Sequence, residues 1–194
     1  MRINIYMIGV GGQGLITTSN LIGAAATSRG IKVLTSETHG LSQRGGSVDV
    51  HVRLGDVNSP LIPLGGADLV IAFELLEAFR AAPYINENTK IIVNSRLIRP
   101  PTPRLRLPSA EELINKLNAI RNVKIIDAFN TAIKLGNPIV ENMVLLGAAH
   151  AAGLNLAIDE NAIIEAIKST MRMPELNVKA FKMGIDLVNG SSPR

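Results

Sequence analysis

Four glycines in six positions, G9-V-G-G-Q-G14, separate a strand pattern from a helix pattern near the start of the chain. Residues 3 to 8 are mostly apolar, and the apolar residues of 15 to 29 recur at helical spacing. Gly30 stands where a helix ends, and 31 to 35 are typical of a second strand. A strand, glycine turn, helix and strand within about 30 residues indicate an α/β fold with parallel strands.

The rest of the chain continues this alternation. Short apolar runs predict further strands at 48–54, 68–73, 90–94 and 123–128, with helices after 74, from 109 to 121, and in three segments from 137 onward. We therefore predict one Rossmann-like domain over 1–194, with a mostly parallel sheet, helices on both faces and a helical C-terminal region from about 137. Polar residues alternate with apolar ones in 48–54, so we expect that strand to bury one face and to expose His51.

Composition excludes several kinds of chemistry. The 194 residues contain no cysteine, which removes disulfides, thiolate catalysis, cysteine-bound zinc and iron–sulfur ligation. The net charge of +4 is scattered and only 3% of residues are aromatic, so the chain does not suit nucleic-acid binding. No metal-ligand spacing, signal peptide or long apolar run is present. We expect a cytoplasmic protein that makes no contact with membranes.

Gly9, Gly11 and Gly14 satisfy G-x-G-x-x-G after a strand and before a helix. Missing side chains would let backbone N–H groups approach a pyrophosphate, and Glu37 stands where a dinucleotide-binding fold places its ribose-binding carboxylate. The chain is short for a dehydrogenase, and Gly12 and Gln13 make the turn unusually rich in glycine and amide groups. Dinucleotide binding and a turn that binds nothing both stay open.

The stretch S36-E-T-H-G-L-S-Q-R-G-G-S47 concentrates hydrogen-bonding side chains in a predicted loop after the second strand. The glycine turn and this loop should share the carboxyl edge of the sheet, where α/β folds bind ligands. His39, Ser42, Gln43 and Arg44, followed by Gly45 and Gly46, suit an anionic partner there. The alternative is that Arg44 pairs with Glu37 or Asp49 and that the loop is interface scaffolding.

Together, G9-V-G-G-Q-G14, the 36–47 stretch and the following V-D-V-H-V-R resemble the gamma-type subunits of 2-oxoacid:ferredoxin oxidoreductases, among them the beta subunits of indolepyruvate ferredoxin oxidoreductases. The likeness continues through A67-D-L-V-I-A-F-E74 and N142-M-V-L-L-G147 to N177-V-K-A-F-K-M-G184. It covers nearly the whole chain.

The resemblance implies an accessory subunit without catalytic or metal-binding residues, inactive alone and paired with a large alpha subunit that carries thiamine pyrophosphate and iron–sulfur clusters. The pair would decarboxylate an aryl 2-oxoacid oxidatively, form an acyl-coenzyme A and pass electrons to ferredoxin, and paired alpha–beta units would assemble. Residues that would contact a cofactor, with coenzyme A as the candidate, are Gly9, Gly11, Gly12, Gln13, Gly14, His39, Ser42, Gln43, Arg44, Gly45 and Gly46. The competing interpretations are an NAD-binding oxidoreductase domain, a non-catalytic nucleotide-binding module and a pure interaction module.

Two further features allow two interpretations each. Arg96, Arg99, Arg104 and Arg106 stand among four prolines and either dock an acidic surface or keep an exposed loop soluble. His150 lies among small residues of a predicted helix, where we expect a hydrogen-bonded structural histidine. Those small residues predict close helix packing, within the chain or against a partner.

Overall fold

The computed structural model describes residues 1–40, 45–100 and 107–190. Its six strands are β1 (Arg2–Val10), β2 (Val33–His39), β3 (Ser47–Gly55), β4 (Leu69–Ala72), β5 (Lys90–Asn94) and β6 (Val123–Ile126). The α-helices are α1 (Leu15–Ser28), α2 (Leu75–Arg80), α3 (Ala110–Asn118), α4 (Ala128–Lys134), α5 (Glu141–Ala152), α6 (Glu160–Thr170) and α7 (Pro174–Asn189). Short 3₁₀ turns lie at Ala82–Tyr84, Pro138–Val140 and Leu154–Leu156.

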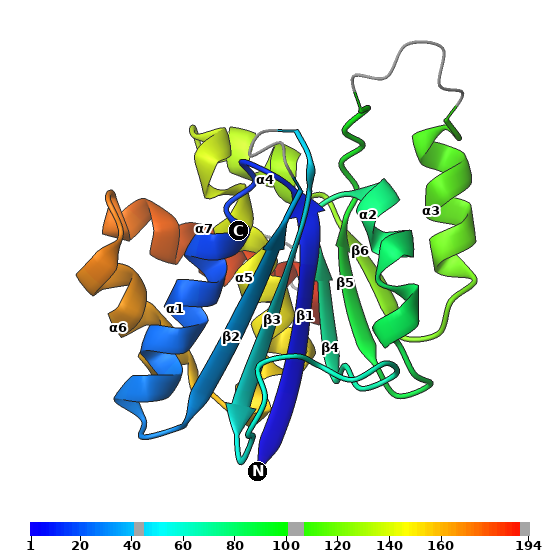
Figure 1. The fold of residues 1–194 in the computed structure, drawn as a ribbon. Helices are drawn as coiled ribbons and strands as arrows, with labels where there is room; N and C mark the ends of the chain where they lie inside the picture. The colour runs from blue at the N-terminus through cyan, green and yellow to red at the C-terminus, as the bar shows by residue number, and fades with distance from the viewer. Residues whose placement is uncertain (41–44, 101–106, 191–194) are drawn as a thin grey trace.

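The strands form one sheet in the order β2-β3-β1-β4-β5-β6 (Figure 1). β1, β4, β5 and β6 run parallel, whereas β3 is antiparallel to both β1 and β2. Because β1 and β2 are each antiparallel to β3, they run in the same direction as each other. The sheet is therefore mostly parallel, as expected, with one inserted antiparallel strand.

Helices cover both faces of the sheet. One core packs Met7, Val50 and Ile92 against α1, α5, α6 and α7, and the opposite core packs Ile8 and Val93 against α2 and α3. In Figure 1, α5 is seen behind the strands and α2 in front of them. The predicted helical C-terminal region is α5 to α7, and it belongs to the first of these cores.

Local capping residues set the ends of several helices. Ser109 and Glu112 form the capping box of α3, Asp159 caps α6, and Gly190 follows the last residue of α7 in a left-handed conformation. The third predicted helix ends at Asn118 rather than at 121. Strand β2 extends to His39, so the first residues of the predicted 36–47 loop pair with β3 instead.

The expectation that β3 exposes one face is wrong. His51 and Arg53 are only 3% and 8% exposed, because the segment after β3 folds back over them. The Ile62 N–H donates to His51 Nδ1 at 3.1 Å, and Arg53 Nη1 donates to the carbonyl of Ser59 at 2.8 Å. His51 is thus an internal residue rather than a surface or interface one.

Candidate functional site at the carboxyl edge of the sheet

The glycine turn and the start of β3 meet at the carboxyl edge of the parallel strands. The N–H of Gly11 donates to the carbonyl of Gly46 at 2.9 Å, which ties the turn to the end of the 36–47 stretch. The predicted convergence of these two segments is confirmed for the part that is described. Ser42, Gln43 and Arg44 lie outside the described residues, as does the side chain of His39, the last residue of β2.

Gln13 supports the turn from within. Its Oε1 accepts from the Val10 N–H at 2.8 Å, and its Nε2 donates to the Phe73 carbonyl at 2.8 Å. The carboxamide therefore bridges the ends of β1 and β4, the neighbouring strands at the centre of the sheet. Gly9 is required beside it, since a Cβ there would lie 2.7 Å from Phe73 Cβ. Gln13 thus holds the turn against the end of β4, and Gly9 allows Phe73 to pack beside it.

Gly14 begins α1 in a left-handed conformation, with φ of 84°. No side chain caps this helix, and its first internal backbone bond runs from Thr18 to Gly14. A Cβ on Gly14 would lie 2.7 Å from Asn142 Nδ2. The Asn142 side chain, which α5 carries, is thus packed directly against the turn. Glycine permits both the left-handed backbone and this close approach.

An ion pair that the sequence does not signal lies beside the turn. Arg96 Nη1 donates to Glu141 Oε2 at 2.6 Å, Asn94 Nδ2 donates to Glu141 Oε1 at 2.5 Å, and the Arg96 guanidinium lies 4.1 Å from the Phe129 ring centroid. Burial raises the pKa of Glu141, whereas Arg96 and Asn94 act to lower it. Arg96 is thus neither a free docking cation nor part of an exposed loop, while Arg99 beyond it is exposed.

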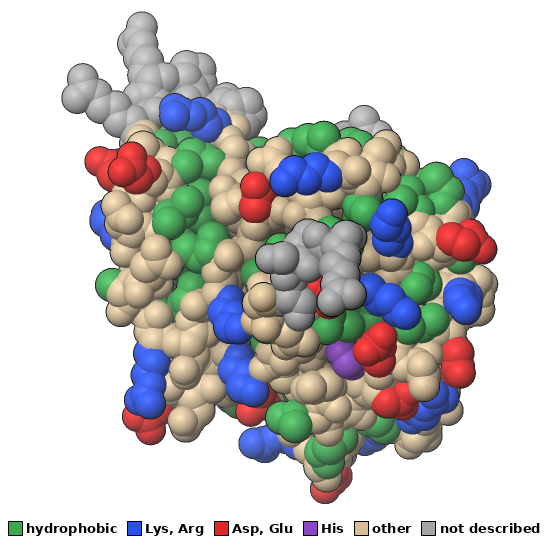
Figure 2. All heavy atoms as spheres, turned by 180° about the vertical axis from the view of Figure 1, so that it is seen from behind, with side chains coloured by type: hydrophobic (Ala, Val, Ile, Leu, Met, Phe, Trp, Pro, Cys, Tyr) green, Lys and Arg blue, Asp and Glu red, His purple; other side chains and the backbone are tan. Residues whose placement is uncertain are grey.

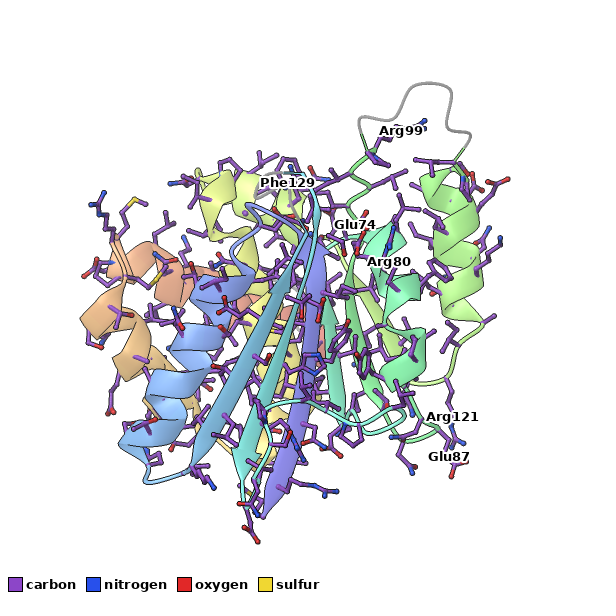
Figure 3. All side chains as sticks on the ribbon, in the orientation of Figure 1. Glu74, Arg80, Glu87, Arg99, Arg121 and Phe129 are labelled. Carbon is purple, nitrogen blue, oxygen red and sulfur yellow. The ribbon has the colours of Figure 1, made fainter. Side chains whose placement is uncertain are left out.

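These groups line a hollow of about 800 Å³. Its lining residues are Val10, Gly11, Gly12, Gln13, Gly14, Thr17, Gly45, Arg96, Ile98, Phe129, Pro138, Ile139, Glu141, Asn142 and Met171. Figure 3 shows Phe129 and Glu74 near the same end of the sheet. This volume lies within the range of small-molecule sites in proteins.

A smaller hollow of about 280 Å³ adjoins the first one at Val10, Gly45 and Ile98. Its acidic residues are Glu74, which is fully buried, and Glu77, which accepts from Ser47 Oγ at 2.5 Å. Burial raises the pKa of Glu74, although its carboxylate accepts the N–H groups of Glu77 and Ile98. Glu74 therefore anchors the segment that separates the two hollows.

The topology counts against a dinucleotide site. Strand β3 lies between β1 and β2, so the end of β2 is two strand spacings, about 10 Å, from β1. In a dinucleotide-binding fold the two strands are neighbours, which brings the ribose-binding carboxylate close to the glycine turn. Glu37 does not have that position here.

The remaining polar candidates are structural, and the charge is dispersed. His150 is buried and its Nε2 lies 3.1 Å from the Ile158 carbonyl, so it is hydrogen-bonded as expected, and burial lowers its pKa. Within the described ranges, no three His, Asp or Glu residues gather as metal ligands would, and no helix is long and apolar enough to span a membrane. Figure 2 shows Lys and Arg scattered among acidic residues over one face.

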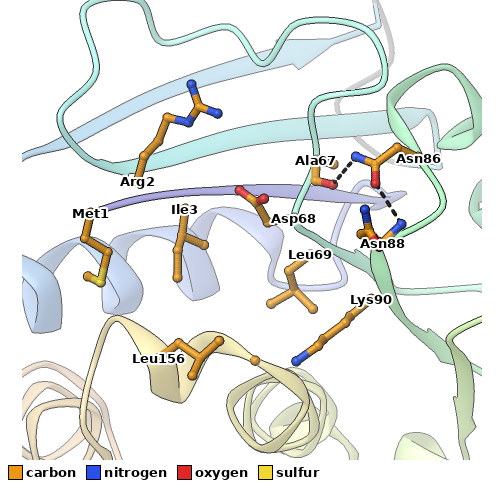
Figure 4. A pocket seen from close by; sticks show the side chains of 11 residues that line it. Met1, Arg2, Ile3, Ala67, Asp68, Leu69, Asn86, Asn88, Lys90 and Leu156 are labelled. Carbon is orange, nitrogen blue, oxygen red and sulfur yellow. Dashed lines mark hydrogen bonds between the residues drawn. The ribbon is translucent and has the colours of Figure 1, made fainter.

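A further hollow, of about 380 Å³, lies at the opposite edge of the sheet (Figure 4). Arg2, Asp68, Asn88 and Lys90 contribute polar groups to it, and Ile3, Leu69 and Leu156 contribute apolar ones. Its lining residues include neither the glycine turn nor the N-terminus of α1, which both lie at the carboxyl edge.

Comparison with known proteins gives consistent matches over the whole chain. The family model for pyruvate ferredoxin/flavodoxin oxidoreductase matches residues 4–187. Indolepyruvate oxidoreductase subunit IorB of Archaeoglobus fulgidus is 43% identical, with 100% of this chain and 98% of the relative covered. The IorB subunit of Pyrococcus horikoshii is 38% identical, with 94% of each covered.

Solved structures have the same fold. The keto/oxoacid ferredoxin oxidoreductase gamma subunit of Geobacter sulfurreducens superimposes with a TM-score of 0.74 at 26% identity, covering 97% of this chain and 99% of that one. The 2-oxoglutarate:ferredoxin oxidoreductase of Magnetococcus marinus matches with a TM-score of 0.71 at 22% identity, over all of this chain and 32% of its own. The second likeness concerns the fold alone.

Proposed function

The chain belongs to the pyruvate ferredoxin/flavodoxin oxidoreductase family, and from that membership we propose that it is the accessory, beta-type subunit of an indolepyruvate-type 2-oxoacid:ferredoxin oxidoreductase. The observation that carries the proposal is the 43% identity to an IorB subunit, which covers 100% of this chain and 98% of the relative. A likeness that covers all of this chain and 98% of the relative favours the same role in the same kind of complex.

We propose that a large alpha subunit carries the redox cofactors. Iron–sulfur clusters are held mainly by cysteine thiolates, and this chain has none, so its residues do not fit a cluster. The alpha subunit would hold the clusters and thiamine pyrophosphate, decarboxylate an aryl 2-oxoacid and pass the electrons to ferredoxin. The chain described here would be inactive alone and would act in paired alpha–beta units.

Its own contribution would come from the carboxyl edge of the sheet. We propose that the glycine turn and the 36–47 stretch face the alpha subunit's active site and contact coenzyme A, the acyl acceptor. The bond from Gly11 to Gly46 supports this, because it holds the two segments together at one edge. The described groups that suit phosphate oxygens are the backbone N–H donors of the turn and the N-terminus of α1.

Arg44 tests the contact with coenzyme A in the assembled enzyme. Arg44→Ala should raise the coenzyme A concentration needed for half-maximal rate, while thiamine-dependent decarboxylation continues. The matched control is Arg99→Ala, which removes an exposed cation from the neighbouring segment. Equal coenzyme A dependence in both variants and in the wild type would rule out the contact.

The subunit assignment is tested by anaerobic affinity purification of the tagged chain from its own cells. We expect a large cysteine-rich protein with bound thiamine pyrophosphate to co-purify, together with indolepyruvate-dependent reduction of a dye. The chain alone should show no such activity. Recovery of the chain by itself with a bound dinucleotide would instead favour the NAD-binding interpretation.

A further inference from the structure

Met173, the residue before α7, has a strained backbone. Its φ and ψ are 56° and 57°, in the left-handed region that glycine favours. Among the described residues, the other non-glycine position with a positive φ is Asn122, and asparagine tolerates this conformation better than methionine does. A methionine kept at such a position indicates that its side chain has a use there.

The chain itself holds this turn in place. The buried Asn177 donates from Nδ2 to the carbonyls of Arg172 and Met173, at 2.8 and 3.0 Å, and its N–H donates to the Met173 carbonyl at 3.1 Å. Asn177 is also the first residue of the N177-V-K-A-F-K-M-G184 stretch of the family resemblance. Its three hydrogen bonds fix the backbone of Met173 and, with it, the direction of the side chain.

The Met173 side chain points away from the core. It is 46% exposed, and its Sδ lies 3.9 Å from Asn137 Nδ2. Asn137 also accepts the Ile139 N–H at 3.1 Å, which places Met173 beside the 3₁₀ turn that carries Ile139. Ile139 is 75% exposed.

Further apolar side chains adjoin these two. Ile139 lines the 800 Å³ hollow together with Pro138 and Met171. The four residues that form what we call the Met173 patch are Pro138, Ile139, Met171 and Met173. The patch therefore continues the carboxyl edge of the sheet on the side of α4 and α7.

The charged groups around the patch are mostly basic. Arg172 lies in the same turn and Lys134 ends the helix that leads to the 3₁₀ turn; both are exposed, and neither pairs with a described residue. Lys168 and Lys179 line a shallow hollow on α6 and α7, together with Glu175. A second copy of the chain would bring like charges together here, whereas an acidic surface would complement them.

We infer that the Met173 patch is a preformed anchor that inserts into an apolar recess with an acidic rim on the large partner subunit. The inference deepens the proposed function and rests on it for the identity of the partner. Methionine and arginine are enriched in protein interfaces. A side chain that is already held in one direction also loses less entropy on association.

Met173→Asn tests the anchor, because it removes the apolar side chain and relieves the strained backbone. In urea the isolated full chain should be as stable as the wild type or more stable. Its affinity for the large subunit, measured by anaerobic sedimentation velocity over a dilution series of the purified complex, should fall by at least about tenfold. Ile139→Ser should weaken the complex as well.

Leu156→Ser is the matched control, since it removes a side chain that is 69% exposed at the opposite edge of the sheet. It should change the affinity by less than about twofold, because it lies outside the anchor. Arg172→Gln should weaken the complex at low salt more than at high salt.

Equal affinity of the Met173→Asn, Ile139→Ser and Leu156→Ser variants in an intact complex would overturn the inference and leave the subunit assignment standing. A lower unfolding free energy of Met173→Asn, or self-association of the chain that this variant abolishes, would overturn it too. If no large subunit co-purifies with the wild type, the inference and the proposed function fall together.

Discussion

Gln13 and Asn142 carry the same functional group, and both lie against the glycine turn. The Gln13 carboxamide is hydrogen-bonded to the Val10 N–H and the Phe73 carbonyl, so it stabilises the junction of β1 and β4. The Asn142 carboxamide instead packs against Gly14, where an added Cβ would lie 2.7 Å from its Nδ2. The sequence named Gln13, and not Asn142, as a candidate for cofactor binding, and only the contacts show that Gln13 also supports the turn.

Gly14→Ala should destabilise the chain by about 2 to 3 kcal/mol, because it combines a left-handed backbone with a contact of 2.7 Å to Asn142. Gly30→Ala is the control, with φ of 71° and no neighbour within 4 Å, and should cost only about 1 kcal/mol. Urea unfolding measures both. Equal losses would show that Asn142 moves away without cost.

His150 predicts a component of stability that depends on pH. Burial lowers its pKa below the ordinary value of 6.5, although Asp159 and Glu160 act to raise it. Below pH 6.5, His150 therefore binds a proton more readily in the unfolded chain than in the folded one. The free energy of unfolding falls as the pH drops, until the pH reaches the folded-state pKa of His150.

The measurement is the unfolding free energy of wild type and His150→Gln between pH 8 and about pH 5. The advantage of the wild type should be greatest near pH 8 and should shrink as the pH falls below about 6.5. An advantage that grows on acidification would contradict a buried neutral imidazole.

At the scale of elements, α5 and α7 cross at a point where two glycines face backbone. A Cβ on Gly147 would lie 1.8 Å from the Phe181 carbonyl oxygen, and one on Gly184 would lie 1.9 Å from the Val144 carbonyl oxygen. The predicted close packing of the small residues in α5 is thus confirmed within this chain. The crossing also holds Asn142, which lies on α5, in its place beside the turn.

Gly147→Ala and Gly184→Ala should each cost about 3 kcal/mol or more, because the clash is with backbone that cannot rotate away. Gly23→Ala in α1 is the control, since its nearest neighbour is Val33 Cγ1 at 3.9 Å. Alanine should there stabilise the helix by up to about 1 kcal/mol. Chemical denaturation of the three variants tests the contrast, which would disappear if α7 could shift along α5.

At the scale of the whole molecule, an ion pair joins the first helix to the C-terminal region. Arg29, which follows α1, donates to Asp159 Oδ2 at 2.8 Å, and Asp159 also caps α6. The bond to Arg29 is the main reason that the pKa of Asp159 falls from 3.8 to about 2, and the Ala162 N–H adds to it. The stabilisation is therefore complete above the unfolded pKa and is lost as the pH falls toward the folded one.

Asp159→Asn removes the charge and keeps a residue that caps helices well. The stability difference from wild type should be constant above about pH 5, decline between about pH 4 and pH 2, and shrink in high salt. Glu165→Gln is the control. Glu165 is the other acidic partner of Arg29, and it is more weakly bonded to Arg29 and more exposed than Asp159. A difference independent of pH would mean that capping, not the ion pair, joins these segments.

Where the signals are local, the sequence predicted the structure well. The strand at 90–94 and the beginning of the helix that follows Ser109 both depend on residues within a few positions of one another. The glycine turn was likewise predicted at the start of α1 and at the carboxyl edge of the sheet. The single-domain organisation over 1–194 stays a prediction.

Long-range contacts account for what was missed. The local pattern predicts that His51 is an exposed strand residue, but the segment at 59–62, which lies later in the chain, covers it. The ion pair of Arg96 with Glu141 joins residues 45 positions apart. Alternation along 48–54 also cannot tell which strands will be its neighbours, so the insertion of β3 between β1 and β2 was not foreseen. That insertion is what moves Glu37 away from the glycine turn.

The sequence by itself determined the succession of strands and helices along the chain and the absence of thiolate chemistry. These follow from backbone preferences and side-chain chemistry that act over a few residues, or from composition. Only the tertiary structure decided which polar side chains are hydrogen-bonded inside the chain, because such a bond depends on where distant segments meet. Gln13 is hydrogen-bonded inside the chain because the Phe73 carbonyl, 60 positions away, lies 2.8 Å from its Nε2.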